Sequence, residues 1–161
     1  MNVWGLIKLV KPKHVWSLSK LCVTHPLFVI PTIIATRKCV KLSNEHYGKL
    51  HHTNGPANGF RHAVWNYLIA RRCARWTKKD EKAVRWAKKV TDWHEDFSPN
   101  SELAQMMDVH NNEIGRIIFL QHKDKGIDDV ILILKKMTKD STKVDTVDNI
   151  ANYKNQMVHI V

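Results

Sequence analysis

The chain has 161 residues, of which 43% are hydrophobic, and this length and composition predict one compact domain with a sizeable core. Lysine and arginine number 26 against 15 acidic residues, and the formal net charge of +11 favours a polyanionic partner such as nucleic acid, an anionic membrane face or an acidic protein. Cys22, Cys39 and Cys73 are odd in number and widely spaced, which argues against a disulfide framework or a thiolate zinc site and for a reducing compartment.

The first 45 residues predict an apolar and basic helical arm. Residues 21–35, LCVTHPLFVIPTIIA, are the most apolar stretch, but they fall short of the roughly 20 apolar residues that a membrane-spanning helix needs. Trp4, Trp16 and nearby lysines suit the headgroup level of a membrane, so the arm either lies at a membrane surface or packs on the domain. Because no small-residue cleavage site follows the first apolar run, we expect a cytoplasmic or peripheral membrane protein, with secretion as an effector as the alternative.

The remainder of the chain predicts an all-α fold, because apolar residues recur with helical periodicity and alternating strand patterns are missing. The expected helices lie at residues 14–24, 27–44, 57–75, 78–96, 101–122 and 128–139. We therefore expect a single compact helical domain of about five or six helices. It divides into an N-terminal arm at 1–45, a helical core with a polar site at 46–139 and a polar C-terminal tail at 140–161.

Short polar signals mark the expected helix boundaries. TKKD at 77–80 has the pattern of a capping box and predicts the start of the fourth helix. SPNS at 98–101 breaks the chain and is expected to cap the fifth helix. Gly126 separates the fifth helix from DDVILILKKM, whose β-branched content is compatible with a strand although its flanks favour a helix.

The fifth expected helix, which includes MMDVHNNEIGRII, contains polar residues on its core face. That face is defined at helical spacing by Leu103, Met107, Ile114 and Ile118. Asn111 lies on the same line, Asp108 lies beside it, and Asn112 is four residues from both Asp108 and Arg116. A buried carboxylate must pair, bind a metal or change its pKa, so Asp108 requires partners. Gly115 costs a helix about 1 kcal/mol relative to alanine, which predicts close approach by another helix or a ligand.

Two other helices repeat this pattern. His62 and Asn66 are four residues apart and interrupt an apolar stripe of the third helix, next to Arg61. His94 extends the apolar line of the fourth helix and precedes Glu95, and a helix C-terminus favours a protonated histidine. A solvated helix end is the alternative for this last segment. Together, the three helices predict either a shared polar site or a buried hydrogen-bond network that fixes their packing.

Three segments in this order resemble a widespread, mostly bacterial domain family of unknown function. They read NGPANGFRHAVWN, then HE, then MDVHNNEIGR, and members of the family carry RHA-x-W-N, H-E and M-D-x-H-N-N-x-x-G-R. The resemblance covers residues 51–120. This chain departs from the pattern at Asn58 and Gly59, where the family more often has an acidic residue and alanine, so its site has lost one charge.

The resemblance implies a shared set of functional residues but no reaction. The set consists of Arg61, His62, Asn66, His94, Glu95, Asp108, Asn111, Asn112 and Arg116. Members of the family occur as terminal modules of larger bacterial proteins, including toxin-like ones, which favours an effector-type hydrolase by association.

The residue types favour hydrolysis of an anionic phosphodiester or phospholipid. His62 or His94 would act as general base, with Glu95 or Asp108 orienting it or holding a divalent metal ion. No HExxH or comparable ligand spacing is present, so a metal is one option and metal-free acid–base chemistry is the other. Arg61 or Arg116 would stabilise a developing anion. The expected substrate-binding residues are Arg61, Asn66, Asn111, Asn112 and Arg116.

The alternative is a non-enzymatic basic helical module in which the polar cluster is structural. Basic residues crowd the fourth and third expected helices at Lys78, Lys79, Lys82, Arg85, Lys88, Lys89, Arg71, Arg72 and Arg75. Such a face either contacts phosphates of nucleic acid or anionic membrane, or is simply solvated. Binding to nucleic acid would weaken steeply with salt, whereas a hydrolase would be sensitive to single changes at His62, His94 or Asp108 while its fold survived.

Overall fold

Helices follow one another along the computed structural model, which describes residues 12–98 and 100–161. In chain order the elements are α2 (Pro12–Thr24), α3 (Pro26–Tyr47), the 3-10 helix η1 (Gly48–His52), α4 (Pro56–Thr77), α5 (Asp80–Phe97), α6 (Glu102–His122), α7 (Ile127–Lys139), β1 (Thr142–Lys143), α8 (Val147–Ile150) and β2 (Val158–His159). The predicted all-α fold is confirmed.

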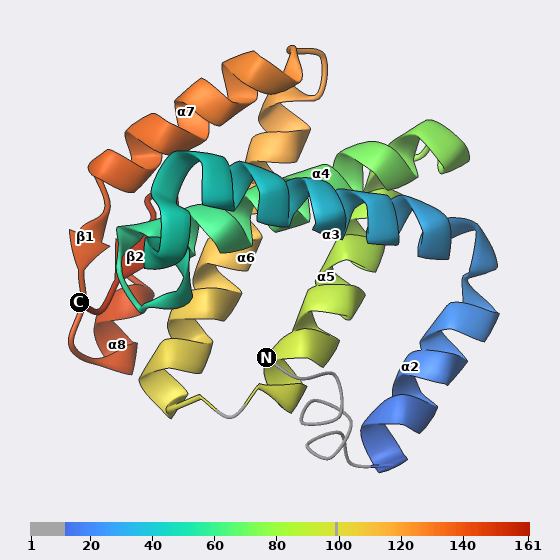
Figure 1. Cartoon of the computed structure of the whole chain (residues 1–161), viewed down its shortest axis with the longest axis horizontal. Helices are drawn as coiled ribbons and strands as arrows, with labels where there is room; N and C mark the ends of the chain where they lie inside the picture. The colour runs from blue at the N-terminus through green and yellow to red at the C-terminus, as the bar shows by residue number, and fades with distance from the viewer. Residues whose placement is uncertain (1–11, 99) are drawn as a thin grey trace.

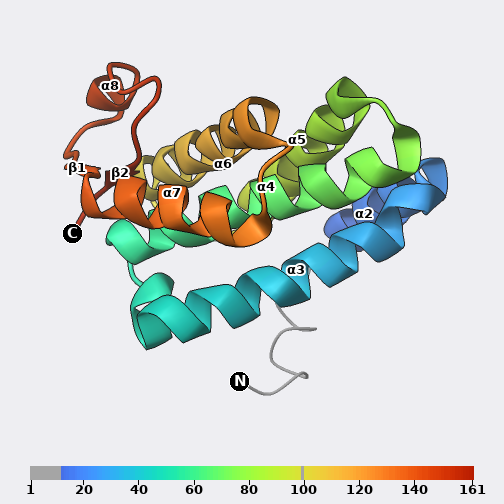
Figure 2. The same ribbon diagram turned by 90° about the horizontal axis from the view of Figure 1, so that it is seen from above.

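Helix α4 lies at the centre of the arrangement. It packs against α3, α5, α6 and α7, so that each of these helices covers part of its circumference (Figure 1). Seen from above, α3 lies on one side of α4, and α5 and α6 lie on the other (Figure 2). The two sides of α4 therefore face different neighbours.

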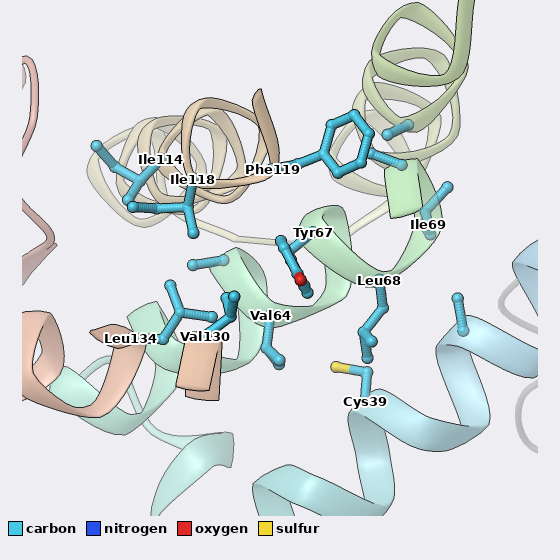
Figure 3. Close-up of a cluster of buried hydrophobic side chains, with 14 of the residues drawn as sticks. Cys39, Val64, Tyr67, Leu68, Ile69, Ile114, Ile118, Phe119, Val130 and Leu134 are labelled. Carbon is cyan, nitrogen blue, oxygen red and sulfur yellow. The ribbon is translucent and has the colours of Figure 1, made fainter. Parts of the chain in front are cut away.

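The apolar core surrounds the middle of α4 (Figure 3). The side chains labelled there come from α3, α4, α6 and α7 and are Cys39, Val64, Tyr67, Leu68, Ile69, Ile114, Ile118, Phe119, Val130 and Leu134. The segment with strand-like composition is a helix, α7, because its buried residues Val130, Ile131 and Leu134 share one helical face against α4.

Helices α4 and α6 approach each other closely at Gly115. A Cβ atom added to Gly115 would lie 2.1 Å from the carbonyl oxygen of Ala63, which no side chain could tolerate. The expected close approach at this glycine is therefore made by α4. Because His62 precedes Ala63 and Asn112 lies one turn before Gly115, the same contact brings the polar residues of the two helices together.

One of the two predicted N-caps is confirmed and the other is wrong. Ser101 is the N-cap of α6, and its side chain accepts a hydrogen bond from the Ala104 backbone N–H at 3.3 Å. Thr77 does not cap α5, because α4 continues to Thr77 and ends at Lys78 in a left-handed conformation. Lys79 is the N-cap of α5 and has no side-chain cap, while the Thr77 hydroxyl accepts from the Lys79 N–H at 2.9 Å.

The chain breaks sharply between α2 and α3 at His25. Pro26 opens α3, where its missing N–H and fixed φ are compatible with the first helical turn. Among the described residues, no single helix has the length and hydropathy of a membrane span. Helix α2 and the segment 26–52 together have that length and hydropathy, but the pair is bent by 116°. Trp4 and the first apolar run lie outside the described residues.

Residues 140–161 fold back onto α6. Their two short strands pair in parallel, with Thr142 opposite Val158. A second apolar cluster joins this segment to α6 and contains Met107, Val144, Ile150 and Val158. Asn111 of α6 holds Val158 from both sides, since its amide nitrogen donates to the Val158 carbonyl at 2.9 Å and its oxygen accepts from the Val158 N–H at 3.2 Å.

Candidate functional site

Polar side chains from α4, α5 and α6 meet in the interior of the domain. The buried members of this network are His62 and Asn66 of α4, Thr91 and Glu95 of α5, and Asp108, Asn112 and Arg116 of α6. Each is at most 4% exposed, as is Asn58 near the start of α4. The structure thus brings together six of the nine residues expected from the sequence in one buried cluster, and Arg61 lies against it half-buried.

The hydrogen bonds of this network run in one direction. Arg116 can only donate, and its Nη1 donates to Asn66 Oδ1 at 2.8 Å. The Asn66 amide nitrogen therefore donates to Asn112 Oδ1 at 2.6 Å, and the Asn112 amide nitrogen donates to Glu95 Oε1 at 3.0 Å. A guanidinium at one end and a carboxylate at the other fix the orientation of both amides.

This direction also fixes the tautomer of His62. Asn112 Oδ1 is an acceptor and lies 3.2 Å from His62 Nδ1, so the proton of a neutral imidazole belongs on Nδ1. Glu95 Oε1 lies 3.5 Å from the same nitrogen. On the other side of the ring, Arg61 Nη2 donates to Nε2, which is consistent with a lone pair there. The hydrogen bond at Nδ1 therefore orients the His62 ring, and the basic lone pair is on Nε2.

Asp108 faces the basic side of His62. Its Oδ1 lies 3.1 Å from His62 Nε2, so two acceptor atoms confront each other unless a proton or a cation lies between them. Burial, followed by the neighbouring charge of Glu95, raises the pKa of Asp108 from 3.8 to about 7, against the opposing effects of Arg61 and of a hydrogen bond from Asn100. Protonation of Asp108 near neutral pH removes the negative charge that faces the lone pair of Nε2.

The two carboxyl groups have pKa values shifted in opposite directions. Burial acts to raise the pKa of Glu95, but donors and charge from His62, the charge of His94 and the Asn112 amide together hold it below its usual value. Burial lowers the pKa of His62, and the positive charge of Arg61 lowers it further. These shifts favour an ionised Glu95, a neutral His62 and an Asp108 that is protonated at a higher pH than an ordinary carboxyl group.

Two buried oxygens in the site have no hydrogen-bond partner among the described residues. These are Glu95 Oε2 and Asp108 Oδ1. A buried acceptor without a donor is costly, by about 1–3 kcal/mol for a neutral group and more for a charged one. A water molecule, a substrate hydroxyl or a cation bound between these oxygens would remove that cost.

A divalent metal ion is one ligand that the site could hold. His62, Glu95 and Asp108 each offer one ligand atom, and these atoms lie within 4.8 Å of one another. However, the Arg61 guanidinium occupies the lone pair of His62 Nε2, and a fixed positive charge opposes a second cation there. Binding of a metal by Nε2 would require Arg61 to move away. The contact with Arg61 therefore opposes metal binding at His62 Nε2.

Partly exposed residues border the buried network. Arg61, His94 and Trp65 are half-buried, and Asn100, whose amide donates to Asp108 Oδ2 at 3.2 Å, is exposed. His94 lies edge-on to Trp65, with ring centroids 5.1 Å apart. The pKa of His94 is lowered, chiefly by burial, so the expected preference for a protonated histidine at this helix end is wrong: loss of hydration outweighs the helix terminus.

The network contains residues that the sequence did not indicate, and it does not include Asn111, which the sequence did indicate. Thr91 donates to Asn66 Oδ1 at 3.3 Å, and Glu113 accepts from Arg116 Nε at 2.9 Å. Thr91 is one turn before Glu95, so helical spacing could have found it, whereas Asn100 lies in a loop and gave no signal. Asn111 is buried, but both ends of its amide bind Val158 and not the network.

Asn58, where the chain departs from the expected acidic residue, contacts the network through Arg61. Its Oδ1 accepts from Arg61 Nη2 at 3.1 Å. The Arg61 Nε donates to the backbone carbonyl of His51 at 3.1 Å. The guanidinium is therefore held by neutral acceptors on this side, and its positive charge is not neutralised there.

The fold and the site define a small helical domain with a buried, directional polar network between three helices. The profile of a protein family described as a domain of unknown function (DUF6973) matches residues 19–142, and the chain belongs to this family. The membership expected from the sequence, in a domain family of unknown function, is confirmed. No curated protein and no solved structure matches the chain.

Proposed function

We propose that the protein is a hydrolase of an anionic ester, a phosphodiester or a phospholipid, with His62 as general base. The observation that carries this proposal is the placement of His62 between two carboxyl groups whose pKa values are shifted apart. Glu95 lies 3.5 Å from Nδ1 and stabilises a positive charge on the ring, while Asp108 lies 3.1 Å from Nε2. Oppositely shifted pKa values separate the base from the acid.

In the proposed reaction, His62 accepts one proton and Asp108 donates one. A water molecule gives a proton to His62 Nε2 while its oxygen attacks the phosphorus or carbonyl carbon. The bond to the leaving alkoxide breaks as protonated Asp108 supplies it with a proton. Transfer of the proton from His62 Nε2 to Asp108 Oδ1, 3.1 Å apart, then restores the starting state.

Arg61 has a second role in this proposal, as the residue that binds the negative charge of the substrate. It is half-buried and donates to His62 Nε2, so it blocks the base while the site is empty. A bound phosphate or oxyanion competes for the same guanidinium and frees Nε2. Arg116 is already engaged by Asn66 and Glu113, and it acts by holding the network in place.

The test is an assay of bis(p-nitrophenyl) phosphate and of phospholipid vesicles with the wild type, His62→Gln and Asp108→Asn. We expect turnover by the wild type and a loss of at least a hundredfold in each variant, with melting temperatures that show a folded domain. His110→Gln is the matched control, because His110 lies on α6 and binds the Gln156 carbonyl, outside the network. Full activity of His62→Gln would refute the assignment of the base.

The choice between metal-free and metal-assisted chemistry has its own measurement. Elemental analysis of purified protein and a melting curve with and without chelator should show no bound zinc or manganese and no shift. One equivalent of metal, together with a lowered melting temperature in chelator, would instead assign His62, Glu95 and Asp108 as ligands.

The second candidate is a non-enzymatic basic module in which the network is structural. It is favoured by the complete burial of His62 and by the basic residues of α5. If no ester is cleaved and RNA binds with steep salt dependence, this candidate replaces the hydrolase. A toxin-like effector role rests on the family resemblance alone, and it predicts that bacteria tolerate expression of His62→Gln better than that of the wild type.

A further inference from the structure

The outer face of α3 is apolar along its first half. Leu27 and Ile30 are 65% and 64% exposed, and Ile33 and Ile34 beside them are also exposed. We call these four residues the apolar stripe. At helical spacing they lie on a different side of α3 from its buried residues, which include Phe28, Ala35 and Cys39. Farther along the same face the residues are basic, with Arg37 and Lys41 exposed.

A basic pocket adjoins the apolar stripe at the break between α2 and α3. It has a volume of about 540 Å³ and is lined on one side by His25 and Leu27 and on the other by Trp76 and the start of α5. Its cations are Lys79, the N-cap of α5, and Lys82, Arg85 and Lys89 of the helix itself. Among the described residues that line the pocket none is acidic, and these four cations form no ion pair with any described residue.

The combination of a cationic pocket and an apolar stripe fits a phospholipid better than nucleic acid. Leu27 belongs to both features, so an anionic group in the pocket and an apolar chain on the stripe would be parts of one ligand surface. Nucleic acid offers phosphates but no aliphatic surface to cover exposed isoleucines. A bilayer offers both, and an interfacial helix buries its apolar face at the level of the headgroups.

We propose that this surface docks the protein on an anionic phospholipid bilayer, with a lipid phosphate in the basic pocket and the apolar stripe in the interface. Trp76, 61% exposed at the pocket rim, lies at headgroup level in this arrangement. The proposal goes beyond the hydrolase function, because it needs no reaction and uses no residue of the His62 network.

The experiment is flotation of the full chain with vesicles of phosphatidylcholine, with or without phosphatidylglycerol. We expect binding only to the anionic vesicles. Lys82→Gln/Arg85→Gln should weaken it about tenfold or more, since each cation near an anionic surface contributes on the order of 1 kcal/mol. Ile30→Ser/Ile34→Ser should weaken it similarly, through loss of buried apolar area.

Matched variants on α7 separate this surface from net charge and general hydrophobicity. Lys136→Gln/Lys139→Gln removes the same charge, and Leu132→Ser removes a side chain that is 64% exposed, like Ile30. Both should bind as the wild type does, and so should His62→Gln, whatever its effect on hydrolysis. An equal loss of binding in the α7 lysine variant would contradict the role of the pocket, and full binding by the isoleucine variant would contradict the role of the apolar stripe. Binding to RNA but not to vesicles would contradict lipid as the ligand.

Discussion

Two faces of α4 are equally buried but are stabilised in different ways. On one face, Leu68 points toward Cys39 of α3, and Val64 lies among apolar side chains (Figure 3). On the face toward α5 and α6, His62 and Asn66 belong to the directional network. An apolar residue contributes its own buried area, so its loss has a graded cost. A network residue also satisfies its neighbours, so its loss leaves other buried groups unpaired.

The largest expected effect separates these two faces directly. Asn66→Leu keeps the volume of the side chain but removes the acceptor of Arg116 and the donor to Asn112. We expect it to lower the free energy of unfolding by about 3–5 kcal/mol, as for a buried charge that loses its partner. Val64→Ala on the apolar face should cost about 2 kcal/mol. Denaturant unfolding measures both, and equal costs would remove the distinction between the faces.

The pH dependence of stability provides the next test. Because the pKa of Asp108 is about 7 in the folded protein and 3.8 ordinarily, the folded state holds a proton that the unfolded state releases, and stability from this group falls as pH rises from about 4 to 7. Asp108→Asn lacks this loss. Its melting temperature relative to the wild type should therefore increase across that range, by an amount worth a few kcal/mol, at about 1.4 kcal/mol per pKa unit. A constant difference would contradict the raised pKa.

The close approach of α4 and α6 can be disturbed without substituting a residue of either face. Gly115→Ala places a methyl group against the Ala63 backbone, and we expect a loss of about 2 kcal/mol from overpacking. Gly126→Ala is the control, because its nearest neighbour is the movable side chain of Asp129. Calorimetry should find Gly126→Ala close to the wild type. If Gly115→Ala is equally mild, the helices are not as close as described.

The smallest expected effect adds a charge beside the polar face. Asn58→Asp places a carboxylate 3.1 Å from Arg61, whose positive charge lowers the pKa of His62. Partial neutralisation should raise the pKa of His62 by about one unit, measured by NMR titration. Asn152→Asp, an exposed change of equal charge, should leave it unaltered. An unchanged value in Asn58→Asp would mean that Arg61 does not act on His62.

The fold was predictable because hydrophobic periodicity decides where helices lie. The expected segments 57–75 and 101–122 correspond to α4 and α6 within two residues at each end. The start of α5 was misassigned, since the local pattern at Thr77 is compatible both with a cap and with the end of α4. A left-handed residue at position 78, which the pattern does not specify, decides between them.

The site was predictable as a set of residues but not as a mechanism. Polar side chains within apolar stripes identify His62, Asn66, Asp108 and Asn112 on each helix separately. Their pairing joins residues 46 to 50 positions apart, and no local pattern determines which amide atom faces which partner. The opposite pKa shifts of Glu95 and Asp108 depend on burial and on charges from other helices, which only the folded arrangement supplies.

The one-way hydrogen bonds also restrict how this protein can evolve. Asn112 must accept on one side and donate on the other, so even an isosteric change to aspartate would set two carboxylates against each other at Glu95. Reversing the chain of bonds would require Arg116 and Glu95 to exchange types together with both amides. Such a change needs several simultaneous mutations. In divergent sequences, these four positions should therefore be retained or replaced as one block, a covariation that an alignment of relatives can reveal.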